Sequence, residues 1–364
     1  MIGLFKNVII FYRLKKGFKM IDYLIVTHIP VFYKINLYNE ISKERKIFVL
    51  FVSDNTGQKR SIDFTGLHNA VFDYECINYG NFEHRNKIKS IFKLVNKIRL
   101  LSFKKIIISG WDLPEFWVSV FMVKKRKNCL ALESTINESI ISGVKGYIKK
   151  LFLNRISHVF ASGKMHAKLI HNLNYRGKVS LTYGVGIINK PLLNKKVYKE
   201  FHKRFVFIGR LSPEKNLSDT ILVFNNQPDI ELQIYGSGPQ ENYLKSIAGN
   251  NISFMGSIAN SQLQGVFNNV DFLLLLSKSE TWGLVVEEAL YFGVPVILSD
   301  TCGASELIND GVNGFILPIN NLKDKLNSLL IDFMEDSESF NLSIDKNFID
   351  EKDETQVKVY FLKN

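Results

Sequence analysis

The chain contains 364 residues and has a formal net charge of +12; 46% of its residues are hydrophobic and 23% are charged. This length predicts two domains of about 150 to 200 residues each, and the composition is ordinary for a soluble globular protein. The three cysteines, Cys76, Cys129 and Cys302, are odd in number and widely separated. They argue against a disulfide framework and a clustered metal site, and they favour a reducing compartment.

The positive charge is concentrated in the first half of the chain. Residues 1–200 contain 35 Lys and Arg against 13 Asp and Glu, or +22, whereas residues 201–364 contain 12 against 22, or −10. A basic half indicates either an anionic partner, such as a phospholipid surface, a lipid pyrophosphate or nucleic acid, or a lysine-rich solvated exterior. Nucleic acid is disfavoured because no zinc-finger, RNP-like or helix-turn-helix pattern accompanies the lysines.

The opening segment, residues 1–19, is basic and apolar. Two interpretations stay open: the segment lies in a membrane interface, or it precedes a true start at Met20. No apolar run approaches the roughly 20 residues of a membrane span, and no small-residue cleavage site follows the segment. We therefore predict a cytoplasmic protein without a membrane span or a signal peptide.

Strands and helices alternate along the first half. Strands are expected at 23–26, 47–52, 106–108, 129–132, 158–161 and 179–182, with a helix between 30 and 41 and an aromatic helix after Pro114. This alternation predicts a doubly wound parallel sheet with its ligand crevice beyond the carboxyl ends of the strands.

The second half repeats the alternation after a lysine-rich, aperiodic stretch. Strands are expected at 205–208, 231–235, 252–254, 272–276, 294–298 and 315–316, and helices at 284–292, 322–333 and 353–362, the last two peripheral. The run 272–276 is apolar on both faces, as in a central strand of a parallel sheet. We predict an N-terminal segment (1–19), an N-terminal Rossmann-like domain (20–186), a linker (187–204), a C-terminal Rossmann-like domain (205–334) and a C-terminal tail with a helix (335–364).

A glycine and two cations follow the first strand of the second half. Gly209 permits a close backbone approach, Arg210 can contact two phosphate oxygens, and Lys215 adds a compact charge. These residues predict a diphosphate site, although solvated surface charges are the simpler alternative. The Gly236-Ser-Gly238 turn after the next strand can approach a flat or anionic group, or can serve only as a tight turn.

Two glutamates, Glu280 and Glu288, stand eight positions apart around an apolar core. Gly283 and Leu284 lie between them at a strand-to-helix junction, where the first helical N–H groups lack intrahelical partners and suit a phosphate. Glu280 is expected in the loop and Glu288 one turn into the helix, where a carboxylate can accept hydroxyl hydrogen bonds. This pattern predicts a polyhydroxylated, phosphorylated ligand.

The succession of these motifs resembles the donor-binding domain of the retaining family 4 glycosyltransferases (glycosyl transferases group 1), over about 205–318. The resemblance implies the two-domain GT-B fold of class α/β, with 20–186 as the acceptor domain and 205–334 as the nucleotide-sugar donor domain. It also implies that Arg210 and Lys215 neutralise the departing nucleoside diphosphate, that Glu280 holds donor-sugar hydroxyls and that Glu288 binds the ribose. The implied substrate-binding set also contains Gly209, Gly236, Gly238, Thr281, Trp282, Gly283 and Leu284.

The first half departs from the family pattern. Family members often carry a histidine after the fifth strand, whereas Glu133 is expected there in this chain. Glu133 either accepts a hydroxyl hydrogen bond from donor or acceptor, or caps a helix. No Asp-x-Asp pair occurs in the sequence, so we predict a metal-independent enzyme without a cofactor. The histidines show no metal-ligand spacing and are expected at the surface or in packing.

The predicted function is transfer of a hexose-type sugar, with retention, from a UDP- or GDP-sugar to a lipid-linked saccharide. The acceptor and an anionic membrane surface are expected at the inner face of a bacterial membrane, as in O-antigen or capsule synthesis. The alternatives are a sugar-nucleotide epimerase or phosphorylase on the same fold, and an inactive nucleotide-sugar-binding partner. An NAD-dependent oxidoreductase is disfavoured because no Gly-x-Gly-x-x-Gly follows an early strand.

Overall fold

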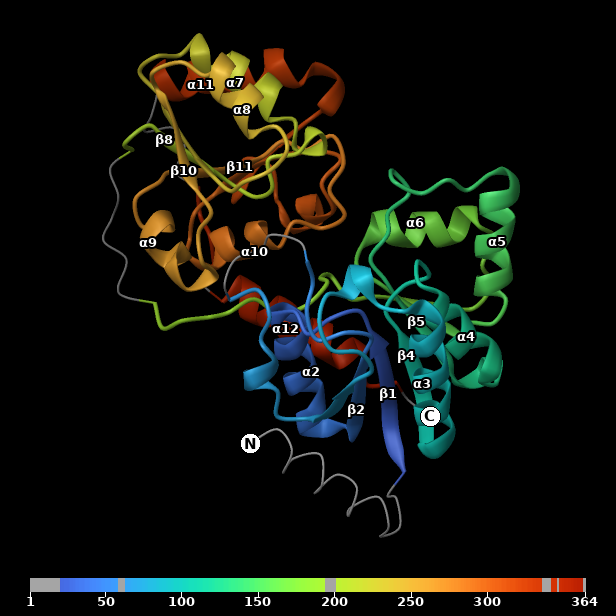
Figure 1. The fold of residues 1–364 in the computed structure, drawn as a ribbon. Coiled ribbons are helices and arrows are strands. Elements are labelled where there is room, and N and C mark those ends of the chain that lie inside the picture. Colours follow the sequence, from blue (N-terminus) through green and yellow to red (C-terminus); the bar gives the residue numbers. More distant parts are fainter. Residues whose placement is uncertain (1–19, 58–62, 194–200, 336–341, 346, 363–364) are drawn as a thin grey trace.

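The computed structural model describes residues 20–57, 63–193, 201–335, 342–345 and 347–362. The predicted opening segment 1–19 lies outside them, as does part of the predicted linker. Two parallel sheets form two α/β halves, which occupy separate regions of the molecule (Figure 1). Within the described residues, no helix combines the length and the apolar character needed to cross a bilayer.

The first half is built on a seven-stranded sheet in the order β3-β2-β1-β4-β5-β6-β7. Neighbouring strands of this sheet all pair in parallel, and β1 lies where the order reverses. The strands are β1 (Ile21–Thr27), β2 (Ile47–Phe51), β3 (Asp73–Cys76), β4 (Phe103–Ile108), β5 (Asn128–Leu132), β6 (His158–Ala161) and β7 (Lys178–Leu181). The helices are α2 (Phe32–Glu44), α3 (Lys87–Leu100), α4 (Pro114–Met122), α5 (Gly143–Leu153) and α6 (Lys164–Asn172).

The second half is built on a six-stranded parallel sheet in the order β10-β9-β8-β11-β12-β13, which reverses at β8. The strands are β8 (Arg204–Ile208), β9 (Glu231–Tyr235), β10 (Ile252–Gly256), β11 (Phe272–Leu275), β12 (Val296–Ser299) and β13 (Gly314–Leu317). The helices are α7 (Leu217–Asn225), α8 (Glu241–Ile247), α9 (Leu263–Phe267), α10 (Leu284–Tyr291), α11 (Leu322–Glu335) and α12 (Phe348–Val359).

Short 3₁₀ turns connect these elements. They are η1 (Leu67–Asn69), η2 (Phe82–His84), η3 (Lys125–Lys127), η4 (Pro213–Lys215), η5 (Asn260–Gln262), η6 (Gly303–Leu307) and η7 (Ile319–Asn321). Two of them, η4 and η6, lie in loops at the carboxyl ends of β8 and β12. These ends are where an open parallel sheet of this kind binds ligands.

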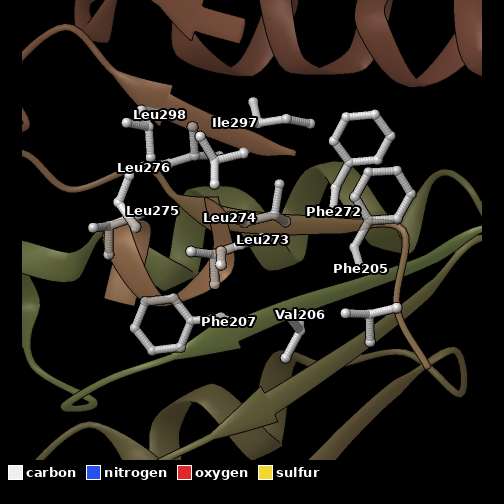
Figure 2. Packing of buried hydrophobic residues seen from close by; sticks show 14 of the residues in the cluster. Phe205, Val206, Phe207, Phe272, Leu273, Leu274, Leu275, Leu276, Ile297 and Leu298 are labelled. Atoms are coloured by element: carbon white, nitrogen blue, oxygen red, sulfur yellow. The ribbon is translucent and has the colours of Figure 1, made fainter. Parts of the chain in front are cut away.

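The core of the second half lies on both faces of β8, β11 and β12. Figure 2 shows the side chains of Phe205, Phe207, Phe272, Leu274 and Ile297 packed among these strands, and all five are buried. The rings of Phe205 and Phe272 stack with centroids 5.4 Å apart. The prediction of a central strand at 272–276 is therefore confirmed, because β11 pairs with β8 on one side and β12 on the other.

The last helix, α12, returns from the second half to the first (Figure 1). Beyond its end the ring of Tyr360 stacks on Phe160 with centroids 4.5 Å apart, and the Tyr23 hydroxyl donates to the Tyr360 carbonyl at 2.6 Å. The prediction of a peripheral helix over 353–362 was wrong in two respects. The helix begins five residues earlier, and Tyr360 joins the core of the first half. The sequence interval 335–353 is weakly patterned, so periodicity did not reveal the helix start.

Candidate functional site

Lys215 and Glu280 form the centre of the candidate site. Lys215 ends η4 after β8, Glu280 lies in the loop between β11 and α10, and the Lys215 ammonium contacts the Glu280 carboxylate. The loop around Glu280 is fixed by its backbone, because Gly303 N–H donates to the Glu280 carbonyl at 3.0 Å. The structure thus brings together two predicted catalytic residues that are 65 positions apart in the sequence.

Arg210, the third predicted catalytic residue, is exposed in the same loop as Lys215. The charges of Arg210 and Lys215 both lower the pKa of Glu214, which lies between them in sequence. Burial tends to raise the pKa of the Glu214 carboxyl, but the Ser212 hydrogen bond and the positive charges of Lys215 and Arg210 lower it overall. The Lys278 N–H donates to the Glu214 carbonyl at 2.8 Å and joins this loop to the one after β11.

The glycines of the Gly236-Ser-Gly238 turn allow two loops to pack backbone to backbone. A Cβ atom on Gly236 would lie 1.8 Å from the Gly209 carbonyl oxygen, and one on Gly238 would lie 2.3 Å from that of Leu211. Leu211 N–H also donates to the Ser237 carbonyl at 3.0 Å. This packing explains the glycines at 236 and 238 and holds the cationic loop in place. Contact of these glycines with substrate stays a prediction.

Gly283 turns the chain into α10. Its φ of +97° lies in the left-handed region that favours glycine, and a Cβ atom there would lie 2.7 Å from Leu275 Cδ2 and 3.4 Å from Glu280 Cγ. Glu280 therefore lies beside the N-terminus of α10, which starts at Leu284. Thr281 belongs to the same loop, and its carbonyl oxygen would lie 2.0 Å from a Cβ atom on Gly303.

The side chain of Trp282 is buried. Its indole N–H donates to Glu287 Oε1 at 2.5 Å, and Lys352 Nζ donates to Glu287 Oε2 at 2.7 Å. Glu287 is fully buried on α10, and Lys352 lies on α12. Sequence reasoning missed both residues. Two adjacent glutamates in an apolar helix could have indicated that Glu287 needs a buried cation as partner. The sequence analysis assigned a role to Glu288 alone.

Glu288 is buried on α10 and accepts a hydrogen bond from Asn260 Nδ2 at 2.5 Å. Burial raises the pKa of Glu288 to about 8. The hydrogen bond from Asn260 lowers this pKa, whereas the carboxylates of Glu287 and Asp63 raise it further. Asp63 belongs to the first half and accepts from the backbone N–H groups of Asn260 and Ser261 at 3.1 and 3.0 Å. The predicted ribose-binding residue therefore lies where the two halves meet.

Glu133 lies in the first half and pairs with Lys34, with 2.8 Å between Nζ and Oε1. Burial tends to lower the pKa of the Lys34 ammonium, but the negative charge of Glu133 raises this pKa overall. A different carboxylate approaches the Lys215–Glu280 pair from the first half: Glu138 Oε1 accepts from the Ser279 hydroxyl at 3.4 Å. Burial and the charge of Glu280 raise the pKa of Glu138. Sequence reasoning missed Glu138 because it lies in an irregular loop without a motif.

The two halves also contact each other through α6 and η6. Glu306 accepts from the Lys164 N–H at the start of α6, and the His166 and Trp282 rings have centroids 6.3 Å apart. His166 is buried, and burial lowers its pKa to about 4, so the imidazole is neutral at pH 7. His166 therefore packs at the junction between the halves.

Known proteins match this chain most clearly in its second half. The family model "Glycosyl transferases group 1" matches residues 191–349, a range that contains Arg210, Lys215, Glu280 and Glu288. The match covers less than half of the chain and lies in its second half. The matched range includes the Lys215–Glu280 pair, the N-terminus of α10 and the buried Glu288.

Among curated proteins, a GDP-mannose-dependent alpha-mannosyltransferase of Corynebacterium glutamicum is 31% identical over 131 residues, which cover 36% of this chain and 31% of that protein. An uncharacterized glycosyltransferase of Methanocaldococcus jannaschii is 26% identical over 278 residues, covering 71% and 76% of the two chains. The chain thus spans only about a third of the length of the first of these relatives.

Among solved structures, Anabaena HepE in complex with UDP and glucose superimposes with a TM-score of 0.67 at 17% identity, covering 93% of this chain and 97% of that one. This similarity shows the fold. The predicted α/β class with two Rossmann-like halves in the GT-B arrangement is confirmed.

Proposed function

We propose that the protein is a metal-independent, retaining glycosyltransferase of family 4. It transfers a hexose-type sugar from a nucleoside diphosphate donor to a saccharide acceptor. The observation that carries this proposal is the Lys215–Glu280 pair beside the N-terminus of α10, within the glycosyl transferases group 1 domain. A cation, a carboxylate and the N-terminus of a helix together match a pyrophosphate joined to a hydroxylated sugar.

The Lys215–Glu280 contact suggests how the donor binds. Each side chain has the other as a partner, so the donor exchanges one ion pair for two contacts: Lys215 with a phosphate oxygen and Glu280 with sugar hydroxyls. As the bond to the sugar breaks, negative charge grows on the leaving diphosphate. Lys215, Arg210 and the N–H groups of α10 then stabilise that charge, and interactions that strengthen in the transition state raise kcat.

The donor is proposed to be a UDP- or GDP-sugar. Support comes from the names of the similar proteins: one uses GDP-mannose, and one was crystallised with UDP and glucose. Glu288 is proposed to bind the ribose, which agrees with its position one turn into α10. The acceptor is proposed to be a lipid-linked saccharide of bacterial surface polysaccharide synthesis, at the inner face of the membrane, because residues 1–200 carry the positive charge.

The test is a panel of nucleotide sugars followed by product analysis. The donor should raise the midpoint of thermal unfolding, since a ligand that binds only the folded state stabilises it by mass action. With that donor and a saccharide acceptor, NMR should show a product with the donor's anomeric configuration, and EDTA should leave turnover unchanged. Inversion, or inhibition by EDTA that manganese reverses, would contradict the proposed mechanism. Absence of stabilisation by any nucleotide sugar would contradict the function.

A further inference from the structure

An apolar row lies exposed on α5, in the first half of the chain. Val144, Tyr147, Ile148 and Leu151 expose 75%, 63%, 42% and 40% of their surface. Their spacing of three and four residues places them on one face of the helix. We call these four side chains the α5 row. Apolar side chains this exposed and this regularly spaced indicate a surface that binds something apolar.

The rest of α5 packs against the protein, where Gly146, Phe152 and Leu153 are buried. The Phe152 ring lies 4.9 Å from that of Trp117 and 6.4 Å from that of Trp111, measured between centroids. Lys149 Nζ lies 5.3 Å from the Trp111 ring centroid and donates to the Ile140 carbonyl at 3.1 Å. Because these contacts fix the inner face, the α5 row points away from the core.

The stretch of sequence that contains the α5 row carries only positive charges. From Ser139 to Leu193 the sequence contains nine Lys and Arg and no Asp or Glu. Helical periodicity places two of these lysines, Lys145 and Lys150, on opposite flanks of the row. An apolar face bordered by cations matches a bilayer with anionic headgroups, whereas nucleic acid would leave the apolar face without a partner.

The α5 row is also close in sequence to the candidate site. The loop that leads into α5 carries Glu138, which contacts Ser279 in the second half, and the exposed Ile140 two residues later. Figure 1 shows α5 at the outer edge of the first half. An acceptor anchored in a membrane beneath α5 would therefore have its saccharide near the loop that faces Lys215 and Glu280.

We propose that the α5 row, with Lys145 and Lys150, docks the protein on a bilayer that contains anionic lipid. This proposal extends the proposed function. The link between membrane docking and a lipid-linked acceptor rests on that function. The row enters the boundary between headgroups and acyl chains, while the two lysines contact the lipid phosphates. Docking holds the enzyme where its acceptor is confined.

The test is sedimentation of the full chain with phosphatidylcholine vesicles, with and without phosphatidylglycerol. The wild type should bind only the anionic vesicles, and less strongly at high salt. The double variant Val144→Glu, Tyr147→Glu should lower the partition coefficient by about tenfold or more. Tyr243→Glu is the matched control, because Tyr243 exposes 53% of its surface on α8 in the second half.

A second pair of variants tests the charges. Lys145→Gln with Lys150→Gln should weaken binding to anionic vesicles by about fivefold for each lysine, while Lys323→Gln with Lys325→Gln on α11 should leave it unchanged. Nucleotide-sugar stabilisation should be equal in all variants, which separates this test from that of the proposed function.

Three results would overturn the docking proposal. One is a wild type that binds no anionic vesicles. Another is equal vesicle binding by the α5 double variant, which would assign docking to another surface, such as residues 1–19. The third is a wild type that dimerises through the α5 row, seen as a change in molar mass by light scattering in the double variant without a change in vesicle binding.

Discussion

At the scale of single residues, the candidate site is a set of charges that already have partners. Lys215 contacts Glu280, Ser212 donates to Glu214, and Asn260 donates to Glu288. A donor must therefore compete with contacts inside the protein. The ordered partners also keep the side chains near the positions that a diphosphate and a sugar would require, which reduces the entropy lost on binding.

Replacement of either member of the central pair should stop catalysis while the protein stays folded. Lys215→Met removes a cation from the leaving group, and Glu280→Gln removes a charged hydroxyl acceptor. Each is expected to lower kcat by about a hundredfold or more, as for other groups that stabilise transition-state charge. The double variant should lose little more than either single one, because the two side chains act together.

The control for this pair is Lys325→Met on α11, an exposed lysine remote in sequence from the site. Its kcat should equal that of the wild type. Circular dichroism would verify that each variant is folded. Wild-type turnover by either site variant would refute the assignment of Lys215 and Glu280.

Glu288 should make nucleotide binding depend on pH. Its pKa is about 8, so the side chain is mostly protonated at neutral pH. If the ribose hydroxyls bind the ionised carboxylate, binding must release a proton below pH 8. The Kd should then fall about tenfold per pH unit well below pH 8 and become constant above it. Calorimetry in two buffers of different ionisation enthalpy would measure the released proton.

In Glu288→Gln this pH dependence should disappear, because the amide does not titrate. A wild-type Kd that is constant from pH 6 to pH 8 would show that the carboxylate does not change its ionisation on binding.

At the scale of elements, α10 connects the candidate site to the C-terminal helix. Glu287 and Glu288 are adjacent, so they point in directions about 100° apart around the helix. Glu288 faces Asn260, whereas Glu287 lies between the Trp282 indole and Lys352 of α12. The loop that starts α10 is thus fixed by a helix that follows it by more than 50 residues in sequence and also packs on the first half.

Loss of the α12 cation should destabilise the protein. Lys352→Met leaves the Glu287 carboxylate buried without its counter-ion, and removal of one partner of a buried pair costs about 3 to 5 kcal/mol. The midpoint of thermal unfolding at pH 7.5 should fall accordingly. The loss should shrink at low pH, where Glu287 is protonated and neutral.

The matched variant is Lys352→Met with Glu287→Gln. It removes both charges but keeps an oxygen for the Trp282 indole, so it should recover most of the lost stability. If Lys352→Met alone unfolds at the wild-type midpoint, the ion pair does not support α10.

At the scale of the whole molecule, contacts between the halves hold the candidate site together. Glu306 caps the start of α6, Asp63 accepts from the backbone of η5, and α12 packs against both α10 and α2. These contacts come from three stretches of the first half, namely Asp63, α2 and α6, and from three of the second, namely η5, η6 and α12. The relative position of the halves therefore depends on several small contacts rather than on one extensive sheet.

Gly163 lies at one of these contacts. A Cβ atom there would lie 2.5 Å from Glu306 Oε1 and 2.9 Å from the Trp282 ring, so Gly163→Ala should push the halves apart. Small-angle X-ray scattering should show a larger radius of gyration. The Kd of the donor should rise about tenfold, which corresponds to a loss of about 1.4 kcal/mol of binding free energy. Gly265→Ala is the control, because a Cβ atom on Gly265 meets no atom within 4 Å. An unchanged radius of gyration would show that the Glu306 side chain rotates away instead.

The sequence by itself determined the two α/β halves and most of their strands. Apolar runs such as 272–276 are buried on both faces wherever they occur in a parallel sheet, so local pattern was sufficient. It also placed Lys215 and Glu280 at strand ends, and the structure joins them because the carboxyl ends of β8 and β11 are neighbours.

Only the tertiary structure decided which partners the buried charges have. The pairs Glu287–Lys352, Glu133–Lys34 and Asp63–Asn260 each join residues at least 65 positions apart. Burial and pKa depend on what packs against a side chain, and a local pattern does not contain that information. The same reason explains why the α5 row was missing from the sequence analysis: only the packed helix shows that this face points to solvent.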